Sequence, residues 1–387
     1  MTAYPSGDSP DLLELPADDE LEPVDGTPQL APQGWRRLLS WSSGAAPLSV
    51  LLIAGFALGP RGISLLPSAM PLLDPVVPVA LAALGVLLGL AVGDRRTGDR
   101  RLPAAAVLHS AVVMLAVAAG IGLVAVAAMP MESRSFWTLT VVSGICAATA
   151  LTLPSRHALE PRTAATRLIE LGALLPIVAG GLALAVLRAG TPIGAVALVA
   201  QASGVALMLA AAGWLLLTRA SSETEERVFA VSALLLVGGV ADALALSALF
   251  VGLIAGVFWR IAGRRPRDTI RRDVLFVQHP LLVLVLLLAG ARAEPSPAAL
   301  GLAAAYVAVR VAAHLAAGAL ARRVTGAGAP EDLGRYFLAP GVFGVAFALN
   351  AVTAIGDDAS IVHAAVVAGT IGSELVAVVL RPRRVGK

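Results

Sequence analysis

Four ionisable residues lie inside long apolar stretches of this 387-residue sequence. Arg310 and His314 are four positions apart in one stretch, Glu374 lies in the last stretch, and Glu170 lies near the start of another. A charge at the centre of a bilayer costs roughly 2.5–3.5 kcal/mol, so such residues usually mark an ion path, a proton relay or a charge pair. A helix would place Arg310 and His314 on the same face. There, the imidazole could exchange a proton near neutral pH.

Each of these residues also has a plainer interpretation. Arg310 is expected to pair with a buried carboxylate, for which Glu374 is a candidate, but backbone carbonyls could hold it instead. His314 is either a proton carrier or a neutral, hydrogen-bonded core histidine. Glu170 is either part of an ion path or a charge near a helix start.

The remaining polar groups in apolar stretches are weaker candidates. Gln201 and Asn350 are expected to form hydrogen bonds between helices, and Asp242 is expected at an exposed turn. The spacing of the three histidines does not suit a metal site; they are His109, His279 and His363. The single cysteine, Cys146, excludes a disulfide framework and a cysteine-built metal site. No Walker motif, nucleophile elbow or HExxH sequence occurs, so we expect no enzyme, cofactor or metal.

The composition indicates a membrane protein. Hydrophobic residues make up 57% of the chain and charged residues 14%, whereas a typical soluble domain has about 25% charged residues. A soluble fold could not cover this much apolar surface, but a lipid bilayer can. Much of the apolar mass is Ala and Gly, which let membrane helices approach closely.

Apolar stretches long enough to cross a bilayer predict an all-α, polytopic protein of about twelve transmembrane helices. The predicted spans are 45–60, 76–93, 104–129, 136–153, 165–187, 193–217, 228–243, 245–261, 274–291, 297–321, 336–355 and 359–380.

Basic residues fall almost entirely on one side of these spans. With the loops numbered alternately, the other side holds only Arg61, Arg134, Arg188 and Arg292. Because basic loops stay in the cytoplasm, both termini are predicted to be cytoplasmic in a plasma (inner) membrane. The basic clusters are therefore topology signals, and nucleic acid is not an expected partner.

The chain divides into a transmembrane domain, 41–382, between two tails. Residues 1–40 are predicted to be a disordered acidic cytoplasmic tail, since the first 34 carry eight acidic residues and no Lys or Arg. Residues 383–387 form a short basic tail. Partner binding is a second interpretation of the acidic tail.

Two segments echo one another. Residues 49–59 read SVLLIAGFALG and residues 247–257 read SALFVGLIAGV, in the first and eighth predicted spans. An odd offset of seven spans makes the two copies enter the membrane in opposite directions, as in the inverted repeats of many secondary transporters.

Several stretches, in this order, resemble the monovalent cation:proton antiporter superfamily. They are LLIAGFALGPRG at 51–62, VALAALGVLLGLAVG at 79–93, ADALALSALFVGLIAG at 241–256, YVAVRVAAHLAAGALARR at 306–323, LAPGVFGVAFAL at 338–349 and GSELVAVVL at 372–380. The resemblance covers nearly everything from 45 to 382. His314 lies where relatives often have a lysine, and Glu374 matches the family's glutamate in its last helix.

The resemblance implies two inverted five-helix repeats, about 45–187 and 245–380, joined by linking helices at about 193–243. Two broken helices, 136–153 and 336–355, would cross where the ion binds. The helix-breaking residues would be Gly144, Pro340, Gly341 and Gly344, and Thr149 would lie in the ion path. The family also implies small-ion substrates (protons with sodium or potassium) and a homodimer.

One departure weakens the resemblance at the site itself. The family's ion-binding aspartate is missing, and Leu174, Leu175 and Pro176 occupy its place. The leading hypothesis is cation–proton exchange by alternating access. The alternatives are the same fold without proton coupling, with another ion or solute as its substrate, or a non-transporting membrane sensor or scaffold.

Overall fold

The structure is a computed structural model that describes residues 48–64, 73–91, 101–128, 132–149, 171–325 and 333–380. Within these ranges the chain is helical and contains no strand. The predicted acidic tail, the basic tail and Glu170 lie outside the described residues.

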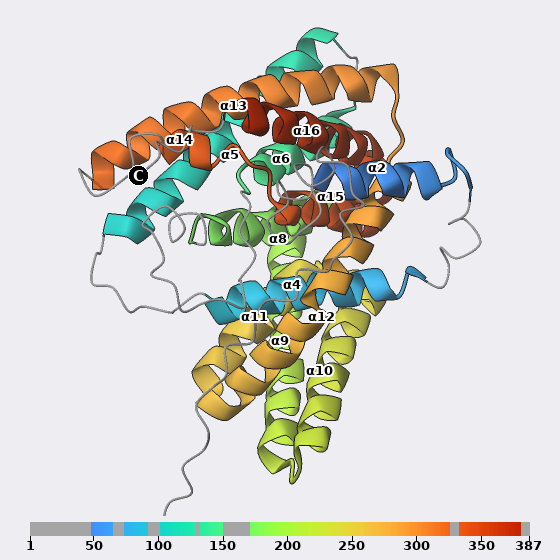
Figure 1. Cartoon of the computed structure of the whole chain (residues 1–387), viewed down its shortest axis with the longest axis vertical. Coiled ribbons are helices and arrows are strands. Elements are labelled where there is room, and N and C mark those ends of the chain that lie inside the picture. Colours follow the sequence, from blue (N-terminus) through green and yellow to red (C-terminus); the bar gives the residue numbers. More distant parts are fainter. Residues whose placement is uncertain are drawn as a thin grey trace, which may run out of the picture. The chain divides into compact units, whose positions relative to one another are not determined.

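The helices keep the order of the predicted spans (Figure 1). They are α2 (Leu48–Leu58), α4 (Val76–Ala91), α5 (Arg101–Ala128), α6 (Ser133–Ala147), α8 (Leu174–Ala189), α9 (Pro192–Arg219), α10 (Glu223–Ala243), α11 (Ala248–Ala262), α12 (Arg264–Ala291), α13 (Pro297–Thr325), α14 (Leu333–Tyr336), α15 (Val342–Ile355), the short 3₁₀ helix η2 (Gly356–Ala359) and α16 (Ser360–Val379). Each predicted span overlaps one of them.

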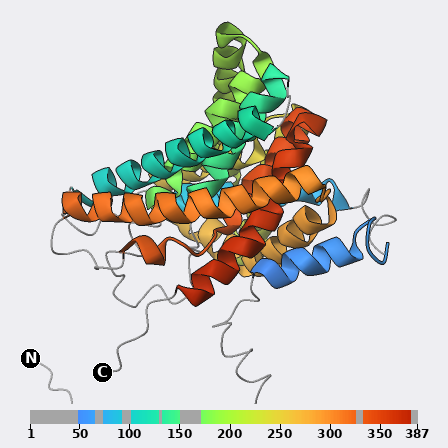
Figure 2. The same ribbon diagram turned by 90° about the horizontal axis from the view of Figure 1, so that it is seen from above.

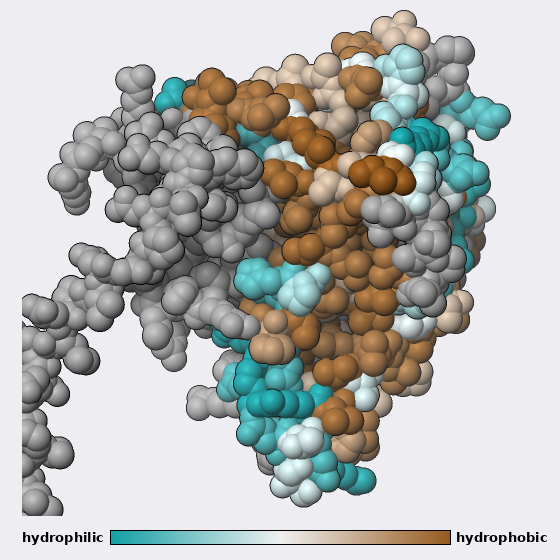
Figure 3. Space-filling model, turned by 45° about the vertical axis from the view of Figure 1, so that its right-hand side comes forward, coloured by the Kyte–Doolittle hydropathy of each residue, from teal (hydrophilic) through white to brown (hydrophobic). Residues whose placement is uncertain are grey.

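Five helical stretches in the described part of the chain are long and apolar enough to cross a membrane. They are 103–128, 192–219, 268–291, 297–324 and 342–379, and shorter apolar helices occur at 48–58, 76–90, 174–189 and 248–262. One face of the molecule carries a broad hydrophobic surface (Figure 3). Helix α12 begins ten residues before its predicted span because its first turns are rich in Arg and Asp, which remain helical although they are not apolar.

Glycines bring pairs of helices into backbone contact. Gly252 and Gly256 of α11 lie against carbonyl oxygens of α4, and Gly85 and Gly89 of α4 lie against carbonyl oxygens of α11. The same kind of contact joins α2 to α12, where Gly55 lies against the Leu287 carbonyl. Close packing of this kind replaces the hydrophobic driving force that lipid-embedded helices lack.

Arginines of the side predicted to be poor in basic residues are bound by their neighbours. Arg61 pairs with Glu294, Arg134 pairs with Asp358, and Arg292 pairs with Asp74. The fourth, Arg188, donates to the carbonyls of Leu244 and Ala245. Each contact therefore joins two segments that were predicted to lie on the same side of the membrane.

Helices α9 and α10 form a hairpin whose turn is fixed by side-chain caps (Figure 1). The Ser222 hydroxyl accepts a hydrogen bond from the Glu225 amide, and Ser221 donates both its amide and its hydroxyl to the Glu225 carboxylate. The bond from the Ser221 amide is the main reason that the pKa of Glu225 is lowered. The two serines and the glutamate together satisfy donors at the start of α10.

We predict that Gly252→Ala destabilises the protein by about 1–3 kcal/mol or more, because the added methyl group overlaps the Ala82 carbonyl oxygen of α4. Thermal unfolding of the purified protein in detergent measures this. Gly204→Ala on α9 is the matched control, since nothing lies within 4 Å of its added methyl group. Equal melting temperatures for the two variants would contradict the α4–α11 contact.

Candidate functional site

Two helices end or break where the sequence predicted crossing helices. Helix α6 stops at Ala147, and Thr149 follows in an irregular segment. On the other side, α14 ends at Tyr336 and α15 begins at Val342 after a non-helical segment that contains Pro340 and Gly341. Gly341 is the extended N-cap of α15. The C-terminal carbonyls of α6 and the N-terminal amides of α15 are thus left free to bind other groups.

The end of α6 and the start of α15 touch at a glycine. A methyl group on Gly344 would lie 2.6 Å from the Cys146 carbonyl oxygen and 2.7 Å from the Thr149 hydroxyl oxygen, so only glycine fits. Gly144 is not a breaking residue as predicted: α6 continues through it, and its missing side chain lets α6 approach the Met114 carbonyl of α5. The helix ends one turn later.

Arg310 joins the two broken helices. It projects from α13 and is 1% exposed. Its guanidinium donates to the carbonyls of Ala147 (3.2 Å) and Thr149 (3.3 Å) at the end of α6, and to the Leu338 carbonyl (2.7 Å) ahead of α15. The carbonyl end of a helix carries partial negative charge, which favours a cation there. Among the described residues, carbonyl oxygens and not a carboxylate therefore bind this charge.

His314 lies beside Arg310 and binds the same helix end. Its Nε2 is 2.9 Å from the Ala147 carbonyl oxygen, and its Nδ1 is 3.4 Å from Nε2 of His109 on α5. Both histidines are buried, and Phe337, from the segment after α14, stacks on the His109 ring at 4.0 Å between centroids. The sequence placed His109 among the weaker candidates because the histidine spacing does not suit a metal site. It gave no sign of the contact with His314, which is 205 residues away.

Glu374 does not neutralise Arg310. Its carboxylate accepts a hydrogen bond of 2.7 Å from the Ser49 amide at the start of α2. A carboxylate at a helix N-terminus binds free amides and the positive end of the helix dipole, so Glu374 ties the last helix to the first. Thr149 does lie at the crossing, where its hydroxyl donates to the Cys146 carbonyl at 2.8 Å.

The weaker candidates separate into exposed and buried residues. Asp242, Gln201 and His279 are exposed, and Asp242 lies in the last turn of α10 rather than in a loop. Asn350 donates to the Ser247 hydroxyl between α15 and α11 at 2.9 Å, as expected of an interhelical amide. His363 is buried in α16.

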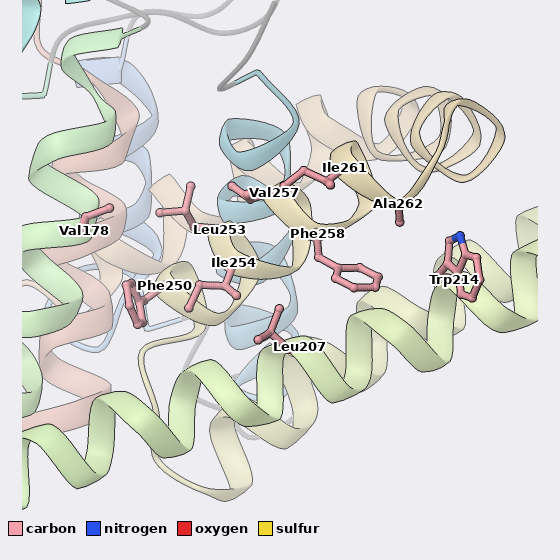
Figure 4. Close-up of a pocket in the computed structure, with 10 residues that line it drawn as sticks. All are labelled: Val178, Leu207, Trp214, Phe250, Leu253, Ile254, Val257, Phe258, Ile261 and Ala262. Atoms are coloured by element: carbon pink, nitrogen blue, oxygen red, sulfur yellow. The ribbon is translucent and has the colours of Figure 1, made fainter.

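The described residues contain no group of three or more His, Cys, Asp or Glu side chains that could hold a metal ion. They do contain a groove of about 490 Å³ between α8, α9 and α11 (Figure 4). Its walls are apolar side chains such as Leu207, Phe258 and Ile261, together with Trp214. Because these walls offer an ion almost no ligand, the crossing of α6 and α15 remains the candidate ion site.

Helix α13, which carries Arg310 and His314, lies alongside α5, which carries His109 (Figures 1 and 2). Close contact with α16 helps to fix its position: Gly369 of α16 lies against the Tyr306 ring, one turn before Arg310. The site is therefore formed by α5, α13, the end of α6 and the start of α15.

Comparison with known proteins locates this arrangement within a known fold. No protein-family model matches the sequence, and no curated protein matches it significantly. A solved structure, the sodium/proton antiporter MjNhaP1 from Methanocaldococcus jannaschii at pH 8, is similar with a TM-score of 0.54 and 17% identity, over 86% of this chain and 89% of that chain. The chain therefore has the fold of this solved antiporter, and its long apolar helices indicate a membrane protein.

Proposed function

We propose that this protein exchanges a monovalent cation, sodium or potassium, for protons at the crossing of α6 and α15. The observation that carries the proposal is the meeting of two interrupted helices at a buried charge, Arg310, within this fold. Free carbonyls at broken helix ends are the usual ligands of alkali cations in secondary transporters. Here carbonyls from the end of α6 and from the segment before α15 converge on the Arg310 guanidinium.

In this proposal, Arg310 acts as a tethered cation. It occupies carbonyls from both broken helices, so a free cation and the guanidinium compete for the same oxygens. Arginine is never deprotonated in proteins, so the competition is settled by movement and not by titration. When no cation is bound, the guanidinium satisfies the carbonyls. When a cation binds, the guanidinium withdraws.

We also propose that the predicted spans cross the membrane as two inverted five-helix repeats joined by the linking helices α9 and α10. In that arrangement α2, α4, α5, α6 and α8 correspond to α11, α12, α13, α14–α15 and α16. Contacts between the two repeats follow this correspondence. Helix α2 lies against α12, the counterpart of α4, and α4 lies against α11, the counterpart of α2. Helix α5 lies against its own counterpart α13, and α6 against α15. The sequence echo between α2 and α11 supports the same pairing.

The same architecture supports alternating access. Helices α4, α9, α10, α11 and α12 are joined by a continuous set of contacts, and α13 contacts both α5 and α16. We propose that the second group, together with α6 and α15, moves against the first with the ion bound. Helix α2 packs on α12 of the first group. The hydrogen bond from the Ser49 amide of α2 to Glu374 of α16 therefore joins the two groups and would form and break in each cycle.

A second candidate function is transport of an anion without proton coupling. The specific observation in its favour is that Arg310 has no carboxylate partner among the described residues, while the N-cap of α15 has no side-chain cap. A fixed positive charge beside a free helix N-terminus suits an anion. A non-transporting sensor or scaffold remains the third alternative.

The deciding experiment is reconstitution of the purified protein into liposomes with a trapped pH dye. Sodium, potassium and chloride gradients are imposed in turn. Exchange predicts that external sodium or potassium makes the lumen alkaline as protons leave. A chloride flux with no pH change would favour the second candidate, and no flux of any ion would favour the scaffold.

We predict that Arg310→Gln lowers both the half-saturating cation concentration and the maximal rate of exchange. Removing a like charge about 7 Å away at an effective dielectric of about 20 relieves roughly 2 kcal/mol of repulsion, so half-saturation should fall at least about tenfold. The rate falls because no guanidinium remains to displace the bound cation. Initial rates of dye response against cation concentration give both values.

Arg323→Gln, an exposed arginine near the end of the same helix, is the matched control and should leave both values unchanged. An Arg310→Gln protein with unchanged or raised half-saturation would rule out competition. It would leave Arg310 a structural role only.

We predict that cross-linking α2 to α16 stops transport. With Cys146, the single native cysteine, replaced by alanine, Ser49→Cys and Glu374→Cys are joined by a short bifunctional thiol reagent. The movement proposed above requires these positions to separate, so the cross-linked protein should lose nearly all flux, whereas each single-cysteine protein should keep its own rate after the same treatment. Full flux in the cross-linked protein would show that α2 and α16 do not separate.

A further inference from the structure

We propose that His109 and His314 together form the group that carries the exchanged proton. The inference rests on the proposed function and assigns its proton site to an imidazole pair. The family's aspartate is missing from the sequence, and Glu374 is bound to α2. The two buried imidazoles lie beside Arg310 and the end of α6, where the structure also describes two weaker acids, Tyr306 and Cys146.

The hydrogen-bond partners fix where the protons lie when both rings are neutral. A carbonyl oxygen only accepts, so Nε2 of His314 must donate to Ala147. Nδ1 of His314 then carries no proton and accepts from Nε2–H of His109. The result is a directed chain: the His109 Nε2–H donates to His314, whose Nε2–H donates to the end of α6.

A proton can pass along this chain without any side chain moving. It arrives at Nδ1 of His109 and forms an N–H bond there. The Nε2–H bond of His109 then breaks as its proton bonds to Nδ1 of His314. His109 is left neutral with the proton on Nδ1, and His314 becomes an imidazolium with both nitrogens protonated. One proton has been added to the pair, a second has moved from His109 to His314, and no electron has been gained or lost.

The protonated pair lies where it opposes a cation. Arg310, from α13, is the charged group that interacts with both rings, while α6 contributes uncharged carbonyls and Cys146, and the segment after α14 contributes Phe337. An imidazolium at His314 binds the Ala147 carbonyl more strongly than a neutral ring does. It also repels any cation at the same oxygens, so proton and cation exclude one another, which is the requirement for exchange.

His109 also lies on a plausible route for the proton. It is eight residues after Arg101, about 12 Å along α5 from the helix start. That end of α5 belongs to the side predicted to be cytoplasmic. Stacking against Phe337 holds the ring in place, so the orientation of its nitrogens is fixed.

The first test uses His109→Gln and His314→Gln in the liposome assay. Glutamine keeps a hydrogen-bonding amide but cannot take up a proton, so cation-driven proton flux should fall about a hundredfold or more, the usual contribution of a positioned proton carrier. His279→Gln, an exposed histidine of α12, is the matched control and should keep the full flux.

The outcomes separate this inference from the function on which it rests. If the unaltered protein exchanges cations for protons and both glutamine variants do so at full rate, the imidazole pair is not the proton site although the function stands. If the unaltered protein moves no protons, the proposed function fails, and the second test decides whether the imidazole chain exists.

The second test needs no transport. Nitrogen-15 NMR of histidine-labelled protein in lipid nanodiscs distinguishes protonated from bare ring nitrogens, and glutamine variants of the other three histidines assign the signals. We expect a bare Nδ1 on His314 at high pH, and one added proton shared by His109 and His314 as the pH falls. A proton on Nδ1 of His314 at high pH, or rings that stay neutral throughout, would overturn the proposal.

Discussion

The contact on which the candidate site depends is a buried guanidinium bound by backbone oxygens. Arg310 satisfies carbonyls that two helix ends leave without partners, and those carbonyls in turn make burial of the charge tolerable. Neither half is stable alone, because a bare helix end and an unpaired cation both cost free energy in lipid. The break in the helices and the charge in α13 therefore depend on one another.

Elsewhere in the fold, small residues and charged residues have different structural roles. Glycines such as Gly252 and Gly344 determine how closely helices approach, and they do so both in the α4–α11 pair and at the crossing. Arginines on the side poor in basic residues are bound at the ends of helices. Two of the buried polar side chains, Arg310 and His314, lie one turn apart on α13. A membrane helix can hold two polar residues one turn apart only if its neighbours supply partners, and α5 and α6 supply them here.

Much of the fold could be predicted from the sequence because apolar stretches of fixed length and one-sided arginines are local signals. The break near Pro340 and Gly341 was equally visible. The site was less predictable. Partner choice depends on packing between distant segments, so neither the His109–His314 contact nor the bond from Ser49 to Glu374 has a sequence signature. The break assigned to Gly144 was wrong because glycine serves close packing as readily as it serves a bend. Glu170 lies outside the described residues and stays a prediction.

In the proposed transport cycle, the permanent charge of Arg310 on α13 makes conformational change sensitive to membrane voltage. Arg310 keeps its charge at every physiological pH and is carried wherever α13 goes. A full elementary charge crossing the whole membrane field changes in energy by about 2.3 kcal/mol per 100 mV, and a partial crossing by the corresponding fraction. Any conformational step that shifts this guanidinium along the membrane normal is therefore biased by membrane voltage, whatever ion the protein carries.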